Sequence, residues 1–383
     1  MAGGPKLLIV TTIPETLRAF LLPYARHYRA LGWRVDAMAS DVTKYDDLAD
    51  EFDNRLDVHW NRNPFNPSNI TKNSDMIREA VAGEDYDIVH THTPVASFVT
   101  RYALRNIRRR GRPAVLYTAH GFHFYDGGKM TRNLVFRTLE RVAGRWTDRL
   151  VTINDEDFAA AKKYGIVPED KLIYMPGIGL DFSLYSPTSV ANTDIRLIRD
   201  QLGLKGDDVL FSMIGEFNPG KRHIDAIKAL AHIESANTHI VFAGEGGTRE
   251  NMQNLARSLG LAKRVHFMGK LKDVAPLIMS SRAILVPSER EGLSRIAMEA
   301  ACLGVPIIGS DARGVRDVVR PGRGLLFPTG DVFALRDAMQ RSAEEPYEGV
   351  IPDESWRIEN LIELHDKMYG ELQKGGETTA PCA

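Results

Sequence analysis

The sequence predicts an α/β protein made of two doubly wound, Rossmann-like domains. In both halves of the chain, short apolar segments rich in Val, Ile and Leu alternate with longer segments of helical spacing. Near-continuous apolar strands separated by helices are typical of a parallel sheet that is covered on both faces. The 383 residues are enough for two domains that each bury a hydrophobic core.

The first domain is expected over residues 1–188. Its predicted strands are Lys6–Thr12, Trp33–Ala39, Ile88–His90, Ala114–Ala119 and Arg149–Ile153. Its predicted helices are Pro14–Leu31, Pro67–Ala82, Pro94–Arg110 and Thr131–Trp146. This order of elements indicates successive strand–helix–strand units of a parallel sheet.

The second domain is expected over residues 189–353, after a polar, proline-containing break around Ser186–Asp194. Its predicted strands are Val209–Ile214, His239–Ala243, Val265–Met268, Ala283–Val286 and Val305–Gly309. Two such domains predict a ligand cleft between them, at the carboxyl ends of the strands. Residues 354–374 have helical spacing, and 375–383 form a polar tail that is expected to be disordered.

The composition narrows the function class. Apolar residues make up 43% and charged residues 26% of the chain, as in soluble globular proteins. Two cysteines, Cys302 and Cys382, form no disulfide framework and favour a reducing compartment. No secretory signal and no membrane-spanning segment are expected. A net charge of −1 argues against a globally basic nucleic-acid binder.

One segment is strongly basic. Between Arg101 and Arg149 there are twelve basic and three acidic residues, so this segment has a charge of +9 and the rest of the chain −10. It includes the predicted helix TRNLVFRTLERVAGRW, in which apolar residues are surrounded by arginines. An ordinary core helix with a solvated basic face would look the same. The alternative is attraction to anionic lipid, worth about 1 kcal/mol for each basic residue near the surface.

A predicted strand–loop–helix–strand segment, ILVPSEREGLSRIAMEAACLGVPIIGSD, contains two spaced glutamates. Glu291 precedes the predicted helix, and Glu299 lies about two turns along it. Backbone amides at the helix start favour an anion. The amides expected there belong to Gly292, Leu293 and Ser294. Carboxylates beside such amides suit a polyhydroxylated phosphate ester, unless Glu291 is merely solvated and Glu299 faces outward.

The motif EGLSRIAMEAACLGVPIIGSD resembles the E-x7-E segment of the retaining glycosyltransferases of family 4, and the likeness extends through most of the chain. The resemblance implies the GT-B fold, in which two domains face a central cleft and the last helix commonly crosses back to the first domain. By position, it implies that Glu291 contacts the donor sugar and Glu299 the ribose hydroxyls. The residues Gly292 to Ser294 would contact the diphosphate.

The segment MIGEFNPGKRHID follows the first predicted strand of the second domain. Lys221 lies six residues after Gly215, where its ammonium could reach a diphosphate as a point charge. The resemblance implies that this lysine, together with an arginine next to the glycine, neutralises the leaving nucleotide diphosphate. Glu216 stands at that arginine position, so Arg222 could compensate, or Lys221 acts more nearly alone. A solvated lysine is the alternative.

Two further loops of the second domain are candidates for donor contacts. The glycine turn AGEGGTRENMQNLA, with Gly244 and Glu245, would face the nucleotide by resemblance, although glycine turns between strand and helix are also common scaffolding. The segment VHFMGKLKDV resembles the one whose backbone meets the base, around Lys270 and Leu271.

Histidines mark the ends of two first-domain strands. The loop YTAHGFHFYDGG places His120 at a strand's carboxyl end, and the resemblance implies that His120 contacts the donor sugar near the reacting carbon. His123 is a weaker candidate. His90 and His92 lie on one face of a strand, but no third ligand follows at a recognisable spacing, so no zinc site is expected.

The chain is therefore expected to be a retaining glycosyltransferase. A glycine-rich loop after the first strand is absent, which resembles a bacterial subgroup acting on polyprenyl-diphosphate-linked sugars. The expected donor is a UDP-sugar, often an N-acetylhexosamine in that subgroup. The expected acceptor is a polyprenyl-diphosphate-linked saccharide of surface polysaccharide synthesis, reached from the cytoplasm at an anionic membrane surface. No cofactor, metal or nucleic acid is expected. A UDP-sugar 2-epimerase and a non-catalytic nucleotide-sugar-binding partner of another transferase are the alternatives.

Overall fold

The computed structural model describes residues 4–61, 66–107, 112–345 and 350–375. The chain divides into two compact units, Met1–Gly179 with Ile358–Ala383, and Leu180–Arg357. The predicted boundary after residue 188 differs from this division, in which residues 180–188 belong to the second unit. Most of the predicted tail, and Arg108 to Arg110 of the helix expected after Pro94, lie outside the described residues.

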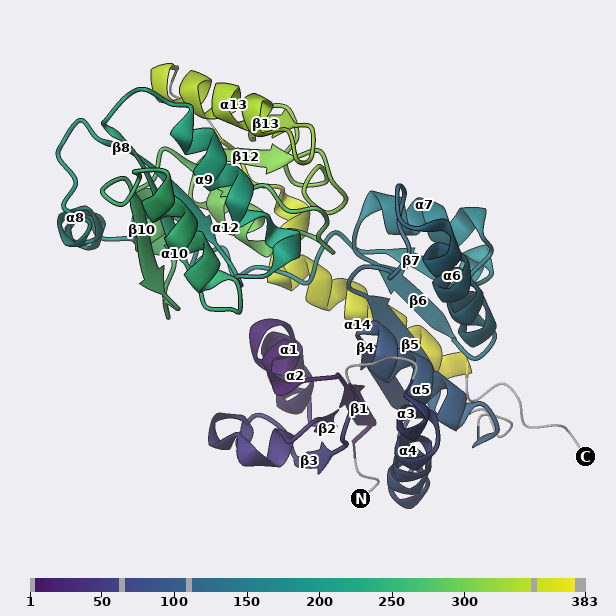
Figure 1. Cartoon of the computed structure of the whole chain (residues 1–383). Helices are drawn as coiled ribbons and strands as arrows, with labels where there is room; N and C mark the ends of the chain where they lie inside the picture. The colour runs from purple at the N-terminus through teal and green to yellow at the C-terminus, as the bar shows by residue number, and fades with distance from the viewer. Residues whose placement is uncertain (1–3, 62–65, 108–111, 346–349, 376–383) are drawn as a thin grey trace, which may run out of the picture. The chain divides into compact units, whose positions relative to one another are not determined.

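The described part of the first unit contains a seven-stranded sheet in the order β3-β2-β1-β4-β5-β6-β7, with every pair parallel (Figure 1). Its strands are β1 (Lys6–Val10), β2 (Arg34–Ala39), β3 (Asn54–Asp57), β4 (Ile88–His92), β5 (Ala114–Ala119), β6 (Arg149–Thr152) and β7 (Leu172–Tyr174). Its α-helices are α1 (Pro14–Thr16), α2 (Leu22–Ala30), α3 (Pro67–Ile70), α4 (Lys72–Glu84), α5 (Pro94–Leu104), α6 (Met130–Gly144), α7 (Asp155–Lys163) and α14 (Ile358–Gly375).

Successive residues of β1 show that helices cover both faces of this sheet. Leu7 and Ile9 are buried in one core with Tyr24 and Tyr28 of α2 and with residues of α14. Leu8 and Val10 point to the opposite face, where they join a second core with residues of α4 and α5. This alternation is the expected consequence of the strand period of two, and it confirms the doubly wound arrangement of the first unit.

The helix expected over Pro14–Leu31 is interrupted by a wider turn, η1 (Leu17–Leu21), between α1 and α2. Pro23 stands at the second position of α2. Because proline has no backbone N–H, the regular bond from this position to the preceding turn cannot form. A wide turn just before the proline is a common local response.

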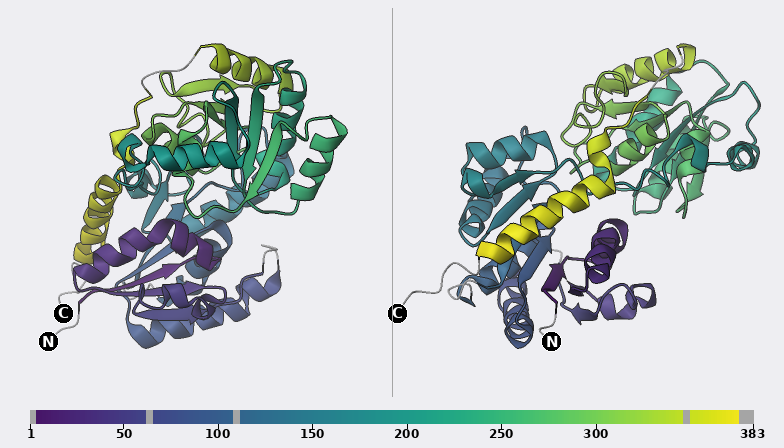
Figure 2. Two further views of the ribbon diagram at one scale, coloured as in Figure 1. Left: turned by 90° about the vertical axis from the view of Figure 1, so that its left-hand side faces the viewer. Right: turned by 180° about the vertical axis from the view of Figure 1, so that it is seen from behind.

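The last helix, α14, belongs to the first unit and follows its sheet (Figure 2). Leu361, Met368 and Tyr369 are buried in the same core as α2. At the start of α14, Ile358 packs against Gly179, where an added Cβ would lie 2.4 Å from Ile358 Cδ1. Gly179 also has φ +86°. Glycine is favoured here because it adopts this positive φ without strain and because a Cβ would clash with Ile358.

The second unit contains a parallel six-stranded sheet within its described residues, in the order β10-β9-β8-β11-β12-β13. Its strands are β8 (Val209–Ile214), β9 (Thr238–Ala243), β10 (Val265–Gly269), β11 (Ala283–Val286), β12 (Ile307–Ser310) and β13 (Gly324–Phe327). Its α-helices are α8 (Asn192–Gln201), α9 (His223–Ala231), α10 (Arg249–Ser258), α11 (Ala275–Met279), α12 (Arg295–Cys302) and α13 (Val332–Glu344).

Each sheet reverses its strand order at one place. In the first unit the reversal lies between β1 and β4, and in the second between β8 and β11. Ligands of doubly wound proteins bind outside the carboxyl ends of the strands at such a switch point. The loops that follow β8 and β11 are therefore the first place to look for a site in the second unit.

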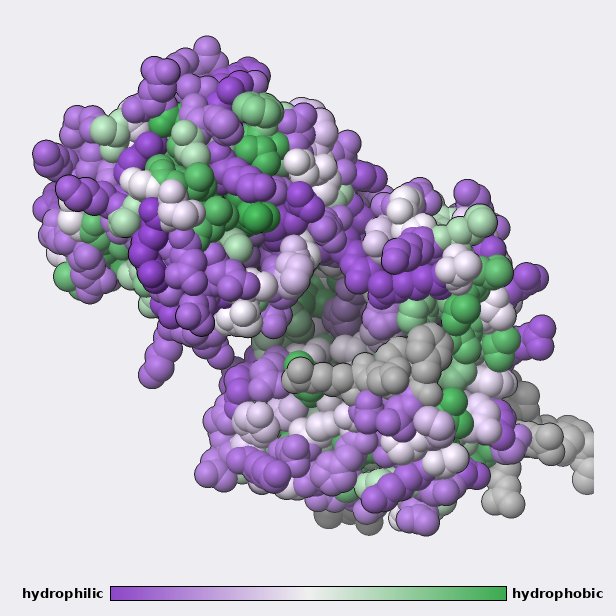
Figure 3. All heavy atoms as spheres, in the orientation of Figure 1, coloured by the Kyte–Doolittle hydropathy of each residue, from purple (hydrophilic) through white to green (hydrophobic). Residues whose placement is uncertain are grey.

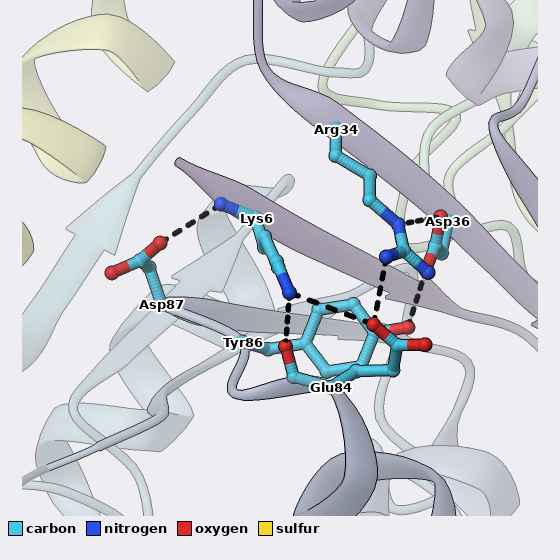
Figure 4. A network of polar contacts seen from close by, with 6 residues as sticks. All are labelled: Lys6, Arg34, Asp36, Glu84, Tyr86 and Asp87. Atoms are coloured by element: carbon cyan, nitrogen blue, oxygen red, sulfur yellow. Dashed lines mark hydrogen bonds and ion pairs between the residues drawn. The ribbon is translucent and has the colours of Figure 1, made fainter. Parts of the chain in front are cut away.

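The opposite, amino-terminal edge of the first sheet is closed by a network of charged side chains (Figure 4). Arg34 pairs with Asp36 at 2.9 Å and with Glu84 at 2.7 Å, and Tyr86 Oη donates to Asp36 at 2.5 Å. Asp36 is fully buried. A buried carboxylate must be hydrogen-bonded to be tolerated, so this network fixes the starts of the strands and is scaffolding.

Candidate active site

Lys221 and Glu291 meet at the switch point of the second unit. Lys221 lies in the short helix η7 (Pro219–Lys221) after β8, and Glu291 follows β11. Lys221 Nζ is 2.6 Å from Glu291 Oε1, and Ser288 Oγ donates to the same oxygen at 2.7 Å. The side chains of the pair are 27% and 16% exposed. Two of the predicted catalytic residues, seventy positions apart, thus form one partly open ion pair.

The loops after β8 and β9 pack directly on each other. A Cβ atom added at Gly244 would lie 2.0 Å from the carbonyl oxygen of Gly215, and Gly244 has φ +148°. Only glycine allows this close approach with this backbone conformation. Lys221 lies over the same place, since a Cβ at Gly215 would be 3.7 Å from Lys221 Cε. The backbones of the predicted Gly215 and Gly244 therefore form the surface next to the Lys221 side chain.

The remaining predicted loop residues lie along the same carboxyl edge. The Gly244 N–H donates to the Gly269 carbonyl at 2.7 Å, which joins the β9 loop to the end of β10. The Glu245 side chain is exposed, as is Lys270 just after β10. Leu271 is half-buried and packs on a small core cluster. Glu245 and Lys270 are thus accessible to a ligand.

Glu299 is buried, so the alternative in which it faces outward is wrong. It lies on α12 and is 5% exposed. Arg295 Nε, one turn earlier, donates to Glu299 Oε1 at 2.8 Å. Burial, and next the Glu299 carboxylate, raise the pKa of Tyr185 to about 12. Arg295 and Tyr185 are not among the predicted site residues. The spacing of four residues between Arg295 and Glu299 was the available signal for the arginine.

The backbone amide of Ser294 differs from the prediction. The Ser294 N–H donates to the Gly314 carbonyl at 2.8 Å, and the Glu291 N–H donates to the Arg313 carbonyl at 2.9 Å. The Ser294 amide is therefore used within the fold and does not point out of α12. Gly292 and Leu293, in the loop before it, are half-buried. The acceptor for the Ser294 amide, Gly314, lies in the loop after β12. The sequence around Ser294 could not reveal this acceptor, because it belongs to a distant segment.

Arg222, expected as a substitute for the arginine that Glu216 replaces, is held by two carboxylates. Its guanidinium lies 2.5 Å from Asp225 and 3.1 Å from Glu289. Glu216 is exposed and accepts from Asn218 Nδ2 at 3.0 Å. The positive charge of Arg222 is balanced by these two carboxylates. Lys221, which has one carboxylate partner, is therefore the stronger candidate for binding a phosphate.

In the first unit, His120 follows β5 and contacts His92, the last residue of β4. His92 Nδ1 is 3.0 Å from His120 Nε2. His120 is half-buried, and its ring lies 6.1 Å from that of Phe20. Burial lowers the pKa of His120 to about 4, so its imidazole is neutral at physiological pH. His123, the weaker candidate, packs its ring edge-on against Phe136 at 4.9 Å.

His90 and His92 lie close together, with ring centroids 4.1 Å apart. His90 is bonded through both nitrogens, to Tyr369 Oη at 2.6 Å and to Thr118 Oγ1 at 2.8 Å. Across the described residues, no group of three or more His, Cys, Asp or Glu side chains has the geometry to hold a metal ion. The expectation that catalysis needs no metal stays a prediction.

The basic stretch is only partly a surface. Arg101 is fully buried and pairs with Glu140 at 2.8 Å, so it does not contribute to a docking face. On α6, however, Met130, Leu134 and Val135 are 84%, 53% and 42% exposed. We call these three residues, with the exposed Lys129, Arg132, Arg141 and Arg145, the α6 patch.

Hydrophobic residues gather on the molecular surface over α6 (Figure 3). Leu134 and Val135, which an ordinary core helix would bury, are open to solvent. Trp146, at the end of this segment, instead packs against Tyr102 with ring centroids 5.9 Å apart. None of the described helices has the length and hydropathy needed to span a bilayer.

Two family models match this chain. The model described as Glycosyltransferase Family 4 matches residues 20–178, and the model described as Glycosyl transferases group 1 matches residues 194–355. Between them they cover most of both units.

Relatives and a solved structure resemble the whole chain. EpsD of Bacillus subtilis, named as a glycosyltransferase, is 33% identical over 345 residues, which are 89% of this chain and 88% of EpsD. The UDP-Gal:α-D-GlcNAc-diphosphoundecaprenol α-1,3-galactosyltransferase of Escherichia coli is 28% identical over 268 residues, 68% of this chain and 67% of that enzyme. The crystal structure of HepE from Anabaena in complex with UDP superposes with a TM-score of 0.72 at 18% identity, covering 97% of both chains.

Proposed function

Because this chain belongs to glycosyltransferase family 4 and has the GT-B fold, we propose that it transfers a sugar from a UDP-sugar to a polyprenyl-diphosphate-linked saccharide. The transfer would retain the anomeric configuration and serve surface polysaccharide synthesis. The names of its relatives support this substrate class, since one acts on a diphosphoundecaprenol-linked sugar. A solved neighbour binds UDP, which supports the donor.

The single observation that carries the proposal is the Lys221–Glu291 pair at the switch point. The Lys221 ammonium is balanced by one carboxylate, that of Glu291. A diphosphate brings more negative charge than that carboxylate and would draw the lysine toward itself. Glu291 would then be released to accept hydrogen bonds from sugar hydroxyls. Donor binding and sugar positioning would thus be coupled through one ion pair.

The remaining residues complete the donor site. Glu299 would accept from the ribose hydroxyls, and Glu245, Lys270 and Leu271 line the edge proposed for the nucleotide. Arg295 donates a hydrogen bond to Glu299, so it would share this carboxylate with the ribose. Arg295 is the first residue of α12. At this helix start its guanidinium would add to the positive charge that stabilises the diphosphate.

In the proposed step, the bond between the sugar's anomeric carbon and the phosphate oxygen breaks, and a bond from the acceptor oxygen forms. The proton of the acceptor hydroxyl passes to the leaving diphosphate. Lys221 and the amides near Gly292 and Leu293 would stabilise the negative charge that develops on this group. Glu291 and His120 would position the sugar. A covalent intermediate on the protein is not part of the proposal.

Docking to an anionic membrane is the second part of the proposal. A polyprenyl chain holds the acceptor at a membrane, so the enzyme must work at its surface. The α6 patch combines exposed apolar side chains with four cations, the composition of helices that lie in the headgroup region. We propose that the protein acts at the cytoplasmic face of the plasma membrane, and the α6 patch supports its docking to an anionic membrane.

The proposal is tested with a panel of UDP-sugars, each incubated with and without a polyprenyl-diphosphate-linked N-acetylglucosamine acceptor. Mass spectrometry of the products distinguishes transfer, epimerisation of the donor and binding without reaction. Lys221→Met should abolish most transfer, while Lys228→Met, an exposed lysine of the same unit, should leave it unchanged. Epimerised donor without acceptor, or no turnover with any donor, would refute the transferase proposal.

A further inference from the structure

We infer that His92 fixes His120 as a hydrogen-bond donor, so that His120 offers the N–H of Nδ1, and not a lone pair, to whatever it contacts. The inference rests on the proposed function in one respect, the role of His120 at the donor sugar. It goes further by assigning the direction of a hydrogen bond and by excluding His120 as the base that deprotonates the acceptor.

The starting point is the contact between the two rings. His92 Nδ1 and His120 Nε2 are 3.0 Å apart, which is a hydrogen-bond distance. A neutral imidazole has one N–H and one lone pair. Exactly one of the two facing nitrogens must therefore have the proton, and this choice sets the tautomer of both rings.

Both rings are neutral because their surroundings disfavour a second proton. Burial lowers the pKa of His92 well below its ordinary value, and the neighbouring imidazoles of His90, His120 and His365 lower it further. For His120, burial alone lowers the pKa to about 4. His90, in ring contact with His92, is bonded to two hydroxyl groups and is itself buried.

The other nitrogen of His92 decides between the two arrangements. His92 Nε2 is buried and has no hydrogen-bond partner within the part of the chain that the structure describes. If His120 donated to His92, the only proton of His92 would lie on Nε2 as a buried N–H without an acceptor. If His92 donates through Nδ1, its Nε2 is merely an unused lone pair. Orphaned buried N–H groups are rarer and less favourable than unused acceptors.

His92 is therefore the donor and His120 Nε2 the acceptor. The proton of His120 then lies on Nδ1, the ring nitrogen that is not used in the contact with His92. A neutral N–H donor at this position suits a sugar hydroxyl or an amide carbonyl. Because Nδ1 of His120 already has a proton, it cannot accept one from the acceptor hydroxyl, and His120 is a neutral donor. His92 acts through His120 and is therefore a positioning residue.

The direct test reads the tautomers in the unliganded full-length protein. Histidine labelled with nitrogen-15 gives different shifts for protonated and unprotonated ring nitrogens, and His120→Asn identifies the signal of His120 by its loss. We expect a protonated Nδ1 and an unprotonated Nε2 for His120. A protonated Nε2 on His120 would overturn the inference.

A variant pair tests the consequence for activity. In His92→Asn the side-chain amide can replace the Nδ1–H donor, whereas His92→Leu removes it and keeps an apolar side chain. We expect His92→Asn to keep most of the transfer rate and His92→Leu to lose about tenfold or more in kcat/KM, with UDP affinity unchanged in both. Equal losses in the two variants, or none in His92→Leu, would mean that His92 only fills space.

The two experiments separate this inference from the proposed function. The tautomer is measured without substrate, so it is decided even if the wild-type protein transfers no sugar. In that case the proposed function fails and the tautomer result stands or falls alone. If transfer is observed but the two His92 variants do not differ, the function holds and the positioning role is refuted.

Discussion

At the residue scale, the surroundings of each side chain decide what it can do. Glu291 is partly exposed and forms an ion pair with Lys221, whereas Glu299 is almost fully buried and forms an ion pair with Arg295. Both are glutamates of one motif, yet only the first can exchange its partner without uncovering a buried charge. Leaving a buried charge unpaired is strongly unfavourable. Variants at Glu299 must therefore keep an acceptor for Arg295.

The prediction for Glu299 uses the isosteric amide. Glu299→Gln keeps an oxygen for Arg295 but weakens its hydrogen bonds to ribose hydroxyls, because charged acceptors bind about twice as strongly as neutral ones. We expect UDP affinity to fall by about tenfold, with little change in the melting temperature. Calorimetric titration of UDP measures this. Glu344→Gln, at an exposed end of α13, is the control, and equal affinity of both variants would contradict the ribose assignment.

A second prediction at this scale concerns metal ions. Lysine and backbone amides are proposed to balance the leaving diphosphate, so transfer should persist in the presence of a chelator. We expect EDTA to change the initial rate by less than about twofold, a difference of ~0.4 kcal/mol in the barrier. A complete loss that magnesium or manganese restores would show that a cation is required.

At the element scale, α6 differs most from an ordinary surface helix. Its inner side holds Glu140, which pairs with the buried Arg101 of α5, while its outer side leaves Met130 and Leu134 open. The buried pair orients the helix, since breaking such a pair is unfavourable by about 3–5 kcal/mol. The apolar residues are therefore held at the surface by the fold and are not exposed by fraying.

The prediction for the α6 patch is a charge-dependent binding to vesicles. Reversing Arg132, Arg141 and Arg145 to glutamate should weaken binding to phosphatidylglycerol vesicles by roughly a hundredfold, at about 1 kcal/mol for each cation. Binding of the wild-type protein should fall as salt rises, because the Debye length is about 8 Å at physiological ionic strength. Co-sedimentation measures both effects.

The control for this experiment reverses Lys228, Arg257 and Lys263, three exposed cations of the second unit, and changes the net charge equally. It should bind like the wild type. Transfer to a short water-soluble acceptor should be equal in all three proteins. Unchanged sedimentation of the α6 variant would mean that the patch is only solvated. Arg108 to Arg110, also basic, lie outside the described residues and are left unaltered.

Three short strands at the edges of the sheets could not be predicted from the sequence pattern. β3, β7 and β13 were not predicted, whereas every predicted strand is present with ends shifted by at most two residues. The missed strands have three or four residues, and none is fully buried. A short, half-exposed strand has no continuous apolar run, so only its pairing with a neighbour identifies it.

At the scale of the whole molecule, the C-terminal helix belongs to the first unit although the second unit precedes it in the chain. Its buried residues Leu361, Met368 and Tyr369 complete the core beside α2. Tyr369 also bonds to His90. The core of the first unit is therefore incomplete without α14, which begins at Ile358, after the whole of the second unit (Leu180–Arg357).

The prediction at this scale is a truncation. A chain that ends at Arg357 lacks α14 and should lose the cooperative melting of the first unit, since several large side chains leave its core. A chain that ends at Gly375 keeps the helix and should melt like the full-length protein. Calorimetry and limited proteolysis measure the difference. Equal melting of both truncated chains would show that α14 adds nothing to the core.

The sequence by itself determined the α/β class, the two doubly wound units, the family and the loops in which the candidate site residues lie. These follow from local patterns, because apolar runs, glycine turns and motif spacing are visible within a few residues of one another. GT-B was confirmed by the structural likeness to HepE. The assigned roles of the site residues stay predictions.

Only the tertiary structure decided which side chains meet. Lys221 pairs with Glu291, His92 with His120 and Ser294 with Gly314, and each contact joins residues at or beyond the ends of two different strands. Such contacts depend on the order and register of the strands, which the sequence pattern of a single strand does not contain. For the same reason, burial of Glu299 and exposure of Leu134 could not be read from residue type, because each depends on which neighbours the fold brings to it.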